Sequence, residues 1–337
     1  MRRGTRAGTG AAPGGEAAGL PGGGRPMSDQ GPIHPELRYH TYASYLRRRF
    51  GGPVARIAVD GGFTCPNRDG ARGTGGCAYC NNDAFSPVRG AAGVPVEEQV
   101  RRALAVGRRG RGAGRVLVYF QRFSGSYGAP ERLERAYRAA FCDPAVVGIV
   151  IGTRPDCLGP DVLEVIGRLA KEHYVSVELG LQSMSDDVLS RINRGHTVRD
   201  FASAVPALRA LGIDVAAHVI NGLPGDSPEG FASAAPFLSG LGVCGVKLHH
   251  FHVVRGSGIE EAWRSGGVAV PDYGDHVRAA AEFIGRLSPQ AAVLRLVASA
   301  PRDLLLAPLW RRTAGEAARD VAAELARRGI RQGDLAG

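Results

Sequence analysis

Short apolar segments alternate with helical segments through most of this chain. Residues 115–120 read RVLVYF and are almost entirely apolar, which predicts a strand covered on both faces. Buried strands that alternate with helices are typical of parallel strand–helix units. The predicted strands are 56–59, 115–120, 146–152, 174–179, 213–220 and one within 243–254, and the predicted helices are 39–50, 96–106, 130–141, 160–170, 185–193, 199–210 and 227–240. We therefore expect an α/β fold, a partial (β/α)6 barrel.

The composition changes on both sides of this alternating region. Residues 1–32 are rich in Gly, Ala, Pro and Arg, so we expect them to form a disordered tail, and Met27 is an alternative translation start. Residues 33–255 form the predicted barrel. Residues 256–337 form a predicted C-terminal α/β extension, with helices at 272–287 and 315–328 and a strand at 292–297.

Three cysteines, Cys65, Cys77 and Cys80, lie within sixteen residues directly after the first predicted strand. Thiolates suit zinc or an iron–sulfur cluster. A structural zinc site takes four protein ligands, but no histidine occurs in this region and the next cysteine is Cys142. A 4Fe–4S cluster on three cysteines instead leaves one iron free to bind a small molecule. The loop glycines allow the backbone to approach such a cluster closely.

The three cysteines also admit alternative assignments. A zinc deaminase needs a His-x-Glu sequence upstream of its Pro-Cys-x-x-Cys, and none is present. A disulfide framework is untypical of a long chain without a secretory signal. Zinc completed by an outside ligand, in a protein that binds RNA without catalysis, is the alternative that we carry forward.

The overall charge is basic, with 42 Lys and Arg against 32 Asp and Glu, a net charge of +10 and a pI near 9.7. This balance is compatible with binding to nucleic-acid phosphates, although compositional bias also accounts for it. No apolar run reaches the ~20 residues that a membrane span needs. We expect a cytoplasmic protein that does not bind a membrane.

Polar residues follow several predicted strands, at the end of the barrel where parallel α/β enzymes place their sites. Glu178 ends an apolar strand, and a buried carboxylate is costly unless it is paired or bound. It is either ion-paired with Arg154 or Arg194, or it binds a ligand. The histidines of the sixth strand have an ordinary alternative role as hydrogen-bonded core residues.

These motifs resemble those of the radical-SAM superfamily and, more closely, of the bacterial group exemplified by the YhcC and YtqA proteins. The resemblance covers about residues 35–333. The barrel is also similar to the radical-SAM domain of the elongator catalytic subunit, which modifies the wobble uridine of tRNA. The matching segments are the loop 65–80 with its Pro-Asn-Arg-Asp-Gly, 119–121, 153–157, 178–182, 191–196, 222–225, 300–303 and 309–310.

The resemblance implies a partial (β/α)6 radical-SAM barrel that holds a 4Fe–4S cluster and S-adenosyl-L-methionine (SAM). The cluster would use Cys65, Cys77 and Cys80 and would cleave SAM to a 5′-deoxyadenosyl radical. The Gly-Gly-Glu that commonly holds the SAM amino group is absent, and Gln121 stands near its place. Tyr79 would lie beside the adenine, Glu178 would bind the ribose, and Gln182 and Arg194 would meet the methionine carboxylate, so the expected SAM contacts are Tyr79, Gln121, Glu178, Gln182 and Arg194.

The same resemblance implies a tRNA substrate, in the formation of 5-aminomethyl-type wobble uridines, and an electron donor such as flavodoxin or ferredoxin. A radical-SAM enzyme acting on a small metabolite is the second candidate. The segment 296–299 reads Leu-Val-Ala-Ser where the group usually has Leu-Thr-Gly-Asp, which leaves the role of this segment open. No catalytic residue is assigned.

Overall fold

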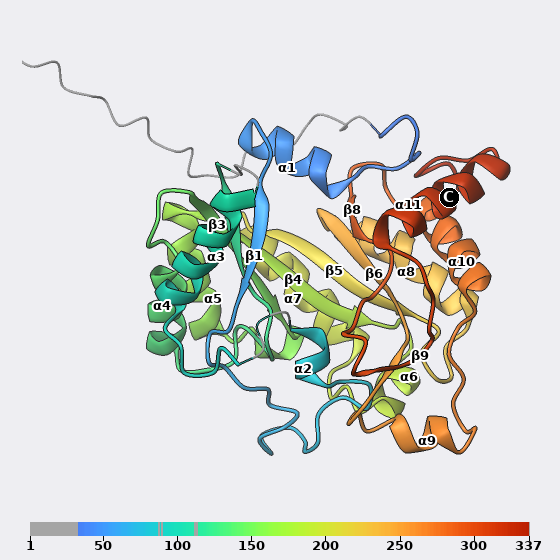
Figure 1. Ribbon diagram of the computed structural model, residues 1–337, viewed down its shortest axis with the longest axis horizontal. Coiled ribbons are helices and arrows are strands. Elements are labelled where there is room, and N and C mark those ends of the chain that lie inside the picture. Colours follow the sequence, from blue (N-terminus) through green and yellow to red (C-terminus); the bar gives the residue numbers. More distant parts are fainter. Residues whose placement is uncertain (1–32, 87, 89, 111–113, 337) are drawn as a thin grey trace, which may run out of the picture.

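A curved parallel sheet of seven strands forms the centre of the protein, in a computed structural model that describes residues 33–86, 88, 90–110 and 114–336. The strand order is β1-β2-β3-β4-β5-β6-β8, so β1 and β8 are the two edges (Figure 1). This is the predicted partial barrel, with one further strand supplied by the C-terminal region. The strands are β1 Ala55–Val59, β2 Val116–Phe120, β3 Val146–Thr153, β4 Tyr174–Gln182, β5 Asp214–Asn221, β6 Gly245–His250 and β8 Ala292–Arg295.

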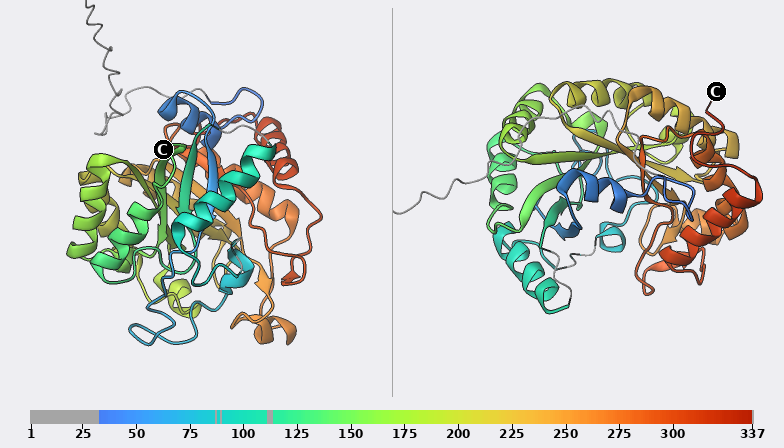
Figure 2. Two further views of the ribbon diagram at one scale, coloured as in Figure 1. Left: turned by 60° about the vertical axis from the view of Figure 1, so that its left-hand side comes forward. Right: turned by 90° about the horizontal axis from the view of Figure 1, so that it is seen from above.

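Helices cover the convex face of the sheet (Figure 2). Side chains such as Val118, Ile149 and Ile151 point outward from the strands into one large apolar core shared with these helices. The helix starts follow local sequence signals: α4, α5 and α8 begin with Pro, and a capping box of Thr197 and Asp200 starts α7. The covering helices are α3 Val96–Gly110, α4 Pro130–Ala139, α5 Pro160–Glu172, α7 Val198–Ala210, α8 Pro228–Leu241, α10 Tyr273–Arg286 and α11 Ala314–Arg327.

The N-terminal helix α1 (Tyr42–Phe50) lies on the concave side of the sheet, at the end where the strands begin (Figures 1 and 2). Its Tyr45 and Leu46 pack against Leu117 and Val150 on the inner face. The helix starts three residues later than predicted because the Thr41 side chain accepts a hydrogen bond from the backbone of the first turn and acts as its N-cap. One end of the barrel is thereby filled, and the other end remains for the site.

The C-terminal region joins the barrel through β8, which pairs in parallel with β6. Beyond it, β7 (Val253–Val254) and β9 (Leu305–Ala307) form a small antiparallel pair, and α9 (Glu260–Arg264) lies between them in the sequence. Two short helices, α2 (Asn82–Phe85) and α6 (Asp186–Arg191), and the 3-10 turn Pro155–Cys157 lie in loops after strands.

The structure does not test the predicted tail or the predicted boundary between the barrel and the C-terminal extension. The predicted disordered tail, residues 1–32, lies outside the described residues, and the boundary at residue 255 stays a prediction. None of the helices in the described part of the chain combines the length and apolar character needed to cross a bilayer.

Candidate functional site

The cysteine loop follows β1 and lies beyond the C-terminal ends of the strands (Figure 1). Two turns shape it: the Arg68 amide donates to the Cys65 carbonyl at 2.8 Å, and the Cys80 amide donates to the Cys77 carbonyl at 2.8 Å. All six cysteines of the chain are free thiols. The three cysteines of the loop line one pocket together.

A distant segment holds this loop in place. The Asn193 side chain donates to the Gly76 carbonyl at 2.8 Å, and the Ala78 amide donates to the Ile192 carbonyl at 2.8 Å. The Asn67 side chain in turn donates to the Asn193 carbonyl. The segment after α6, singled out from the sequence as residues 191–196, therefore anchors the loop.

The loop packs closely on its own side chains at two glycines. A Cβ atom on Gly73 would lie 2.6 Å from Asn67 Oδ1, and one on Gly76, whose φ is +83°, would lie 2.8 Å from Arg68 Nε. Glycine at these two positions therefore fixes the path of the backbone between Cys65 and Cys77.

The donor set of the loop suits a cluster. Its three thiols line one pocket, and a 4Fe–4S cluster takes one thiolate on each of three irons. The three-cysteine donor set of this glycine-rich loop therefore fits a cluster.

Arg194 connects the cysteine loop to the fourth strand. Its guanidinium donates to Cys77 Sγ at 3.4 Å, to His196 Nε2 at 2.8 Å and to the Gly180 carbonyl at 3.3 Å. Burial raises the pKa of the Cys77 thiol, but Arg194 outweighs this effect and the net pKa is lowered, which favours the thiolate. Burial lowers the pKa of His196 to about 2, so the imidazole stays neutral and accepts from Arg194.

Gln182 lies beside Arg194 because of a local irregularity in β4. The pairing of β4 with β5 shifts between Gly180 and Gln182, and Gln182 has a φ of +74°. A Cβ on Gly180 would lie 2.5 Å from both the Arg194 guanidinium and the Gln182 amide nitrogen. Glycine at this position is what allows the two polar side chains to meet.

Glu178 is buried and has different partners from those considered in the sequence analysis. Lys247 Nζ and His218 Nε2 each lie 2.8 Å from Oε2, and an Arg56 nitrogen lies 2.5 Å from Oε1 as an ion pair without hydrogen-bond alignment. Burial raises the pKa of this carboxyl, but Arg56 and Lys247 outweigh it and hold the pKa well below its usual range.

The suggested ion pair of Glu178 with Arg154 or Arg194 was therefore wrong. Arg154 instead forms a bidentate pair with Asp156, at 2.8 and 2.9 Å, and Arg194 binds Cys77. The reason is the pleat and curvature of the sheet, which turn Glu178 toward β1 and β6.

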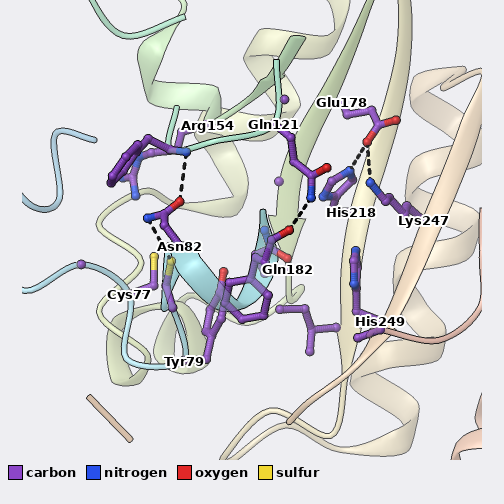
Figure 3. Close-up of a pocket in the computed structure, with 18 of the residues that line it drawn as sticks. Cys77, Tyr79, Asn82, Gln121, Arg154, Glu178, Gln182, His218, Lys247 and His249 are labelled. Carbon is purple, nitrogen blue, oxygen red and sulfur yellow. Dashed lines mark hydrogen bonds and ion pairs between the residues drawn. The ribbon is translucent and has the colours of Figure 1, made fainter. Parts of the chain in front are cut away.

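One pocket gathers the predicted site residues (Figure 3). It encloses about 1200 Å³, including its open mouth, and all eight predicted residues line it: Cys65, Cys77, Tyr79, Cys80, Gln121, Glu178, Gln182 and Arg194. The Gln121 amide donates to the Phe85 carbonyl at 2.6 Å and so ties β2 to the cysteine loop. Tyr79 packs edge-on against Phe85, with ring centroids 6.5 Å apart.

Sequence reasoning missed several pocket residues. Arg295, which lines the pocket, and Arg56, which pairs with the pocket residue Glu178, received no role. Both are charged residues in strands of apolar character, which is the signal that singled out Glu178. Asn82, whose Oδ1 accepts from the Phe123 amide at 3.0 Å, and Phe85 carry no comparable signal because they lie in α2, a single helical turn within a loop.

The fold and the site together place the protein among α/β half-barrels that carry a three-cysteine loop at the C-terminal ends of their strands. The sequence profile of the Radical SAM superfamily matches residues 68–238, and that of the Radical_SAM C-terminal domain matches residues 243–327. The chain belongs to the radical SAM superfamily, which implies a 4Fe–4S cluster and SAM as its cofactors.

Individual relatives agree with this membership. The chain is 36% identical to Protein YhcC of Escherichia coli K12 over 80% of this chain and 87% of that protein. It is 32% identical to the uncharacterized protein YtqA of Bacillus subtilis over 88% of this chain and 92% of that protein. A shorter match, 32% identical over 48% of this chain and 36% of the relative, is to a tRNA uridine(34) acetyltransferase of Dehalococcoides mccartyi. The structure of archaeal Methanocaldococcus infernus Elp3 shares the fold. The match covers 83% of this chain and 64% of the Elp3 chain, with a TM-score of 0.64 and 18% identity.

Proposed function

We propose that this protein binds its cluster through Cys65, Cys77 and Cys80 and modifies the wobble uridine of tRNA by radical chemistry. The bound cofactors supply the reaction by reductive cleavage of SAM to a 5′-deoxyadenosyl radical, which abstracts hydrogen from the substrate. The observation that carries this proposal is the convergence of the three cysteines and the polar strand ends on one pocket.

In this proposal the protein's own residues orient SAM and exclude water. Tyr79 would flank the adenine, Gln121 would hold the amino group, and Glu178 would bind the ribose. Gln182 and Arg194 would receive the methionine carboxylate, for which a guanidinium is a strong donor. The proximity of Arg194 to Cys77 supports this arrangement, because SAM must lie against the cluster.

The tRNA substrate is the finer part of the proposal. It is supported by the match to a tRNA uridine(34) acetyltransferase and by the net charge of +10, which favours phosphate binding. An electron donor such as flavodoxin or ferredoxin completes the reaction, and the cytoplasm is the compartment that this activity requires. Loss of a wobble-uridine modification from the tRNA of a deletion strain tests the substrate; an unchanged nucleoside profile favours a small metabolite.

The first prediction concerns the cluster itself. Anaerobic reconstitution should give about four irons per chain and release of 5′-deoxyadenosine on reduction with SAM present. Cys77→Ala should lose most of the iron and essentially all of this release, because one of three ligands is gone. Cys142→Ala, which removes a thiol that donates only to the Glu97 carbonyl, is the control and should keep both. Retained 5′-deoxyadenosine release in Cys77→Ala would contradict the cluster assignment.

A further inference from the structure

The part of the pocket that β6 and β8 line, together with Arg56 next to it, carries an excess of positive charge. Lys247 on β6 donates to Glu178 at 2.8 Å and to the Tyr119 hydroxyl at 3.3 Å. Arg56 on β1 lies over the Tyr119 ring, 4.3 Å from its centroid. Arg295, on β8, also lines the pocket. Two of these cations, Arg56 and Lys247, pair with the carboxylate of Glu178, and Arg295 interacts with it electrostatically without forming an ion pair.

Arg295 adds a positive charge to this group without bringing a carboxylate partner of its own. It donates to the Val297 carbonyl and to the Ser299 hydroxyl, both at 2.5 Å, and these are neutral acceptors. Within the described residues, Arg295 has no carboxylate within ion-pair distance. Burial lowers the pKa of Arg295, but a guanidinium stays protonated in proteins. Lys247 is only 7% exposed, so this group of charges is poorly solvated, and the single carboxylate of Glu178 stands against the three cations Arg56, Lys247 and Arg295.

Histidines beside these cations have free nitrogens. His249 Nε2 and His252 Nε2 are both buried without a hydrogen-bond partner, and both residues line the pocket. Figure 3 shows the His249 ring directed toward the Lys247 end of the pocket. Buried polar atoms are normally paired, so each of these atoms has capacity for a hydrogen bond with a ligand.

We propose that Lys247, Arg295 and His249 form a subsite for a compact anionic group, a carboxylate or a phosphate, carried by the substrate. This subsite rests on the proposed function in one respect, namely that the substrate enters this pocket. In the proposed function the SAM carboxylate would be held by Arg194, which contacts Cys77, whereas Lys247 contacts Glu178 and Tyr119, so the subsite would take a group other than that carboxylate. The excess charge on this wall selects substrates with a negative group and positions them opposite the cluster.

The test is calorimetric titration of the anaerobic holoenzyme, saturated with SAM, with acetate and separately with inorganic phosphate. Binding of either probe is expected, and the tighter one identifies the chemistry of the group. Lys247→Met and Arg295→Met should each weaken binding by about tenfold or more. Lys171→Met, at an exposed position of α5, is the matched control and should bind as the parent does.

Three results of this titration would overturn the subsite. Absence of binding, equal binding by the Met variants, or loss of binding when SAM is added each contradicts it. Lys247→Arg keeps the charge and should retain binding, which separates loss of charge from misfolding. Release of 5′-deoxyadenosine is measured on the same samples, so failure of the cluster proposal shows there and failure of the subsite shows only in the anion titration.

Discussion

At the scale of single residues, Glu178 illustrates how one buried charge organises a site. Its carboxylate meets Arg56, His218 and Lys247, which come from three other strands of the sheet. Burial lowers the pKa of His218 to about 4, so the ring is neutral at physiological pH and the compensating charges come from Arg56 and Lys247. Removing one partner of such a buried group costs more than the pair itself contributes, because the remaining charge stays desolvated.

Glu178→Gln should therefore be strongly destabilising. The substitution keeps the shape of the side chain but leaves the buried Lys247 and the half-buried Arg56 without their carboxylate, and we expect a loss of about 3–5 kcal/mol in the free energy of unfolding. Urea denaturation followed by circular dichroism measures it. Glu164→Gln breaks an exposed pair with Arg168 and should cost no more than about 1 kcal/mol. Equal effects of the two substitutions would refute the role given to Glu178.

The lowered pKa of Lys247 predicts how anion binding depends on pH. Burial lowers the pKa of Lys247 to about 8 even though Glu178 opposes the shift, so the free ammonium loses its charge as the pH rises through this value. The groups that face it keep their charge states between about pH 6 and 9. The pKa values of Glu178, His218 and His249 lie lower, that of Tyr119 lies higher, and Arg56 and Arg295 remain cationic.

Because the anion binds the charged form, its affinity should fall roughly tenfold between about pH 7 and pH 9. Titrations of the parent protein at several pH values measure this change. Lys247→Arg, whose guanidinium does not titrate in this range, should give a flat profile. A falling profile in that variant would assign the pH dependence to another group.

At the scale of elements, the pairing of β6 with β8 joins the C-terminal region to the barrel. Gly245 pairs with Ala292, and a Cβ on Gly245 would lie 2.6 Å from the Ala292 carbonyl oxygen and 2.4 Å from Leu294 Cδ1. Backbone atoms cannot yield as a flexible side chain can, so this glycine is required for the two strands to approach. β8 also carries Arg295, and its register therefore decides where that charge stands in the pocket.

Gly245→Ala should destabilise the protein by about 1–3 kcal/mol, through overpacking at this strand pair. It should also weaken anion binding, because Arg295 shifts with β8. Gly240→Ala is the control, and it should change the stability in the opposite direction. Gly240 lies exposed in α8 with nothing within 4 Å of its added methyl group, so alanine should stabilise by about 0.5–1 kcal/mol. Thermal melts of both variants measure the difference, and a neutral Gly245→Ala would show that β8 does not need this close approach.

At the scale of the whole molecule, the two ends of the described chain meet at the end of the barrel opposite the site. The buried side chain of Gln332 accepts from the His40 amide and donates to the Ser288 and Ala291 carbonyls, each at 2.7 Å. It thus fastens the segment before α1 and the loop before β8 to the C-terminal segment. Three hydrogen bonds on one buried amide make this connection specific.

Gln332→Ala should cost about 1–3 kcal/mol, because it leaves buried backbone groups without partners. The exposed Gln290 is the control, and its replacement by alanine should have little effect. Hydrogen exchange provides a second readout, since the His40 amide should lose protection in Gln332→Ala. Unchanged protection there would mean that the chain ends are held by apolar packing alone.

Much of this architecture could be predicted from the sequence because its determinants are local. The apolar strands and the Pro and Thr signals at helix starts depend on neighbouring residues. The observed bounds differ from the predicted ones by one residue at one end of β3 and by one residue at each end of β5. The spacing of Cys65, Cys77 and Cys80 is likewise a local property, and it indicated a cluster loop before any contact was known. The left-handed Gln182 and the register shift of β4 have no comparable local signal.

The sequence by itself determined the fold class and indicated the three thiols of the proposed cluster site, since periodicity and the number of thiols within one loop are properties of short segments. Only the tertiary structure decided which charges meet. Glu178 pairs with Arg56 and Lys247, and Arg194 with Cys77, because the curvature of the sheet brings together side chains that lie from 69 to 122 residues apart in the chain. Electrostatic partners depend on position in space, which no local pattern records.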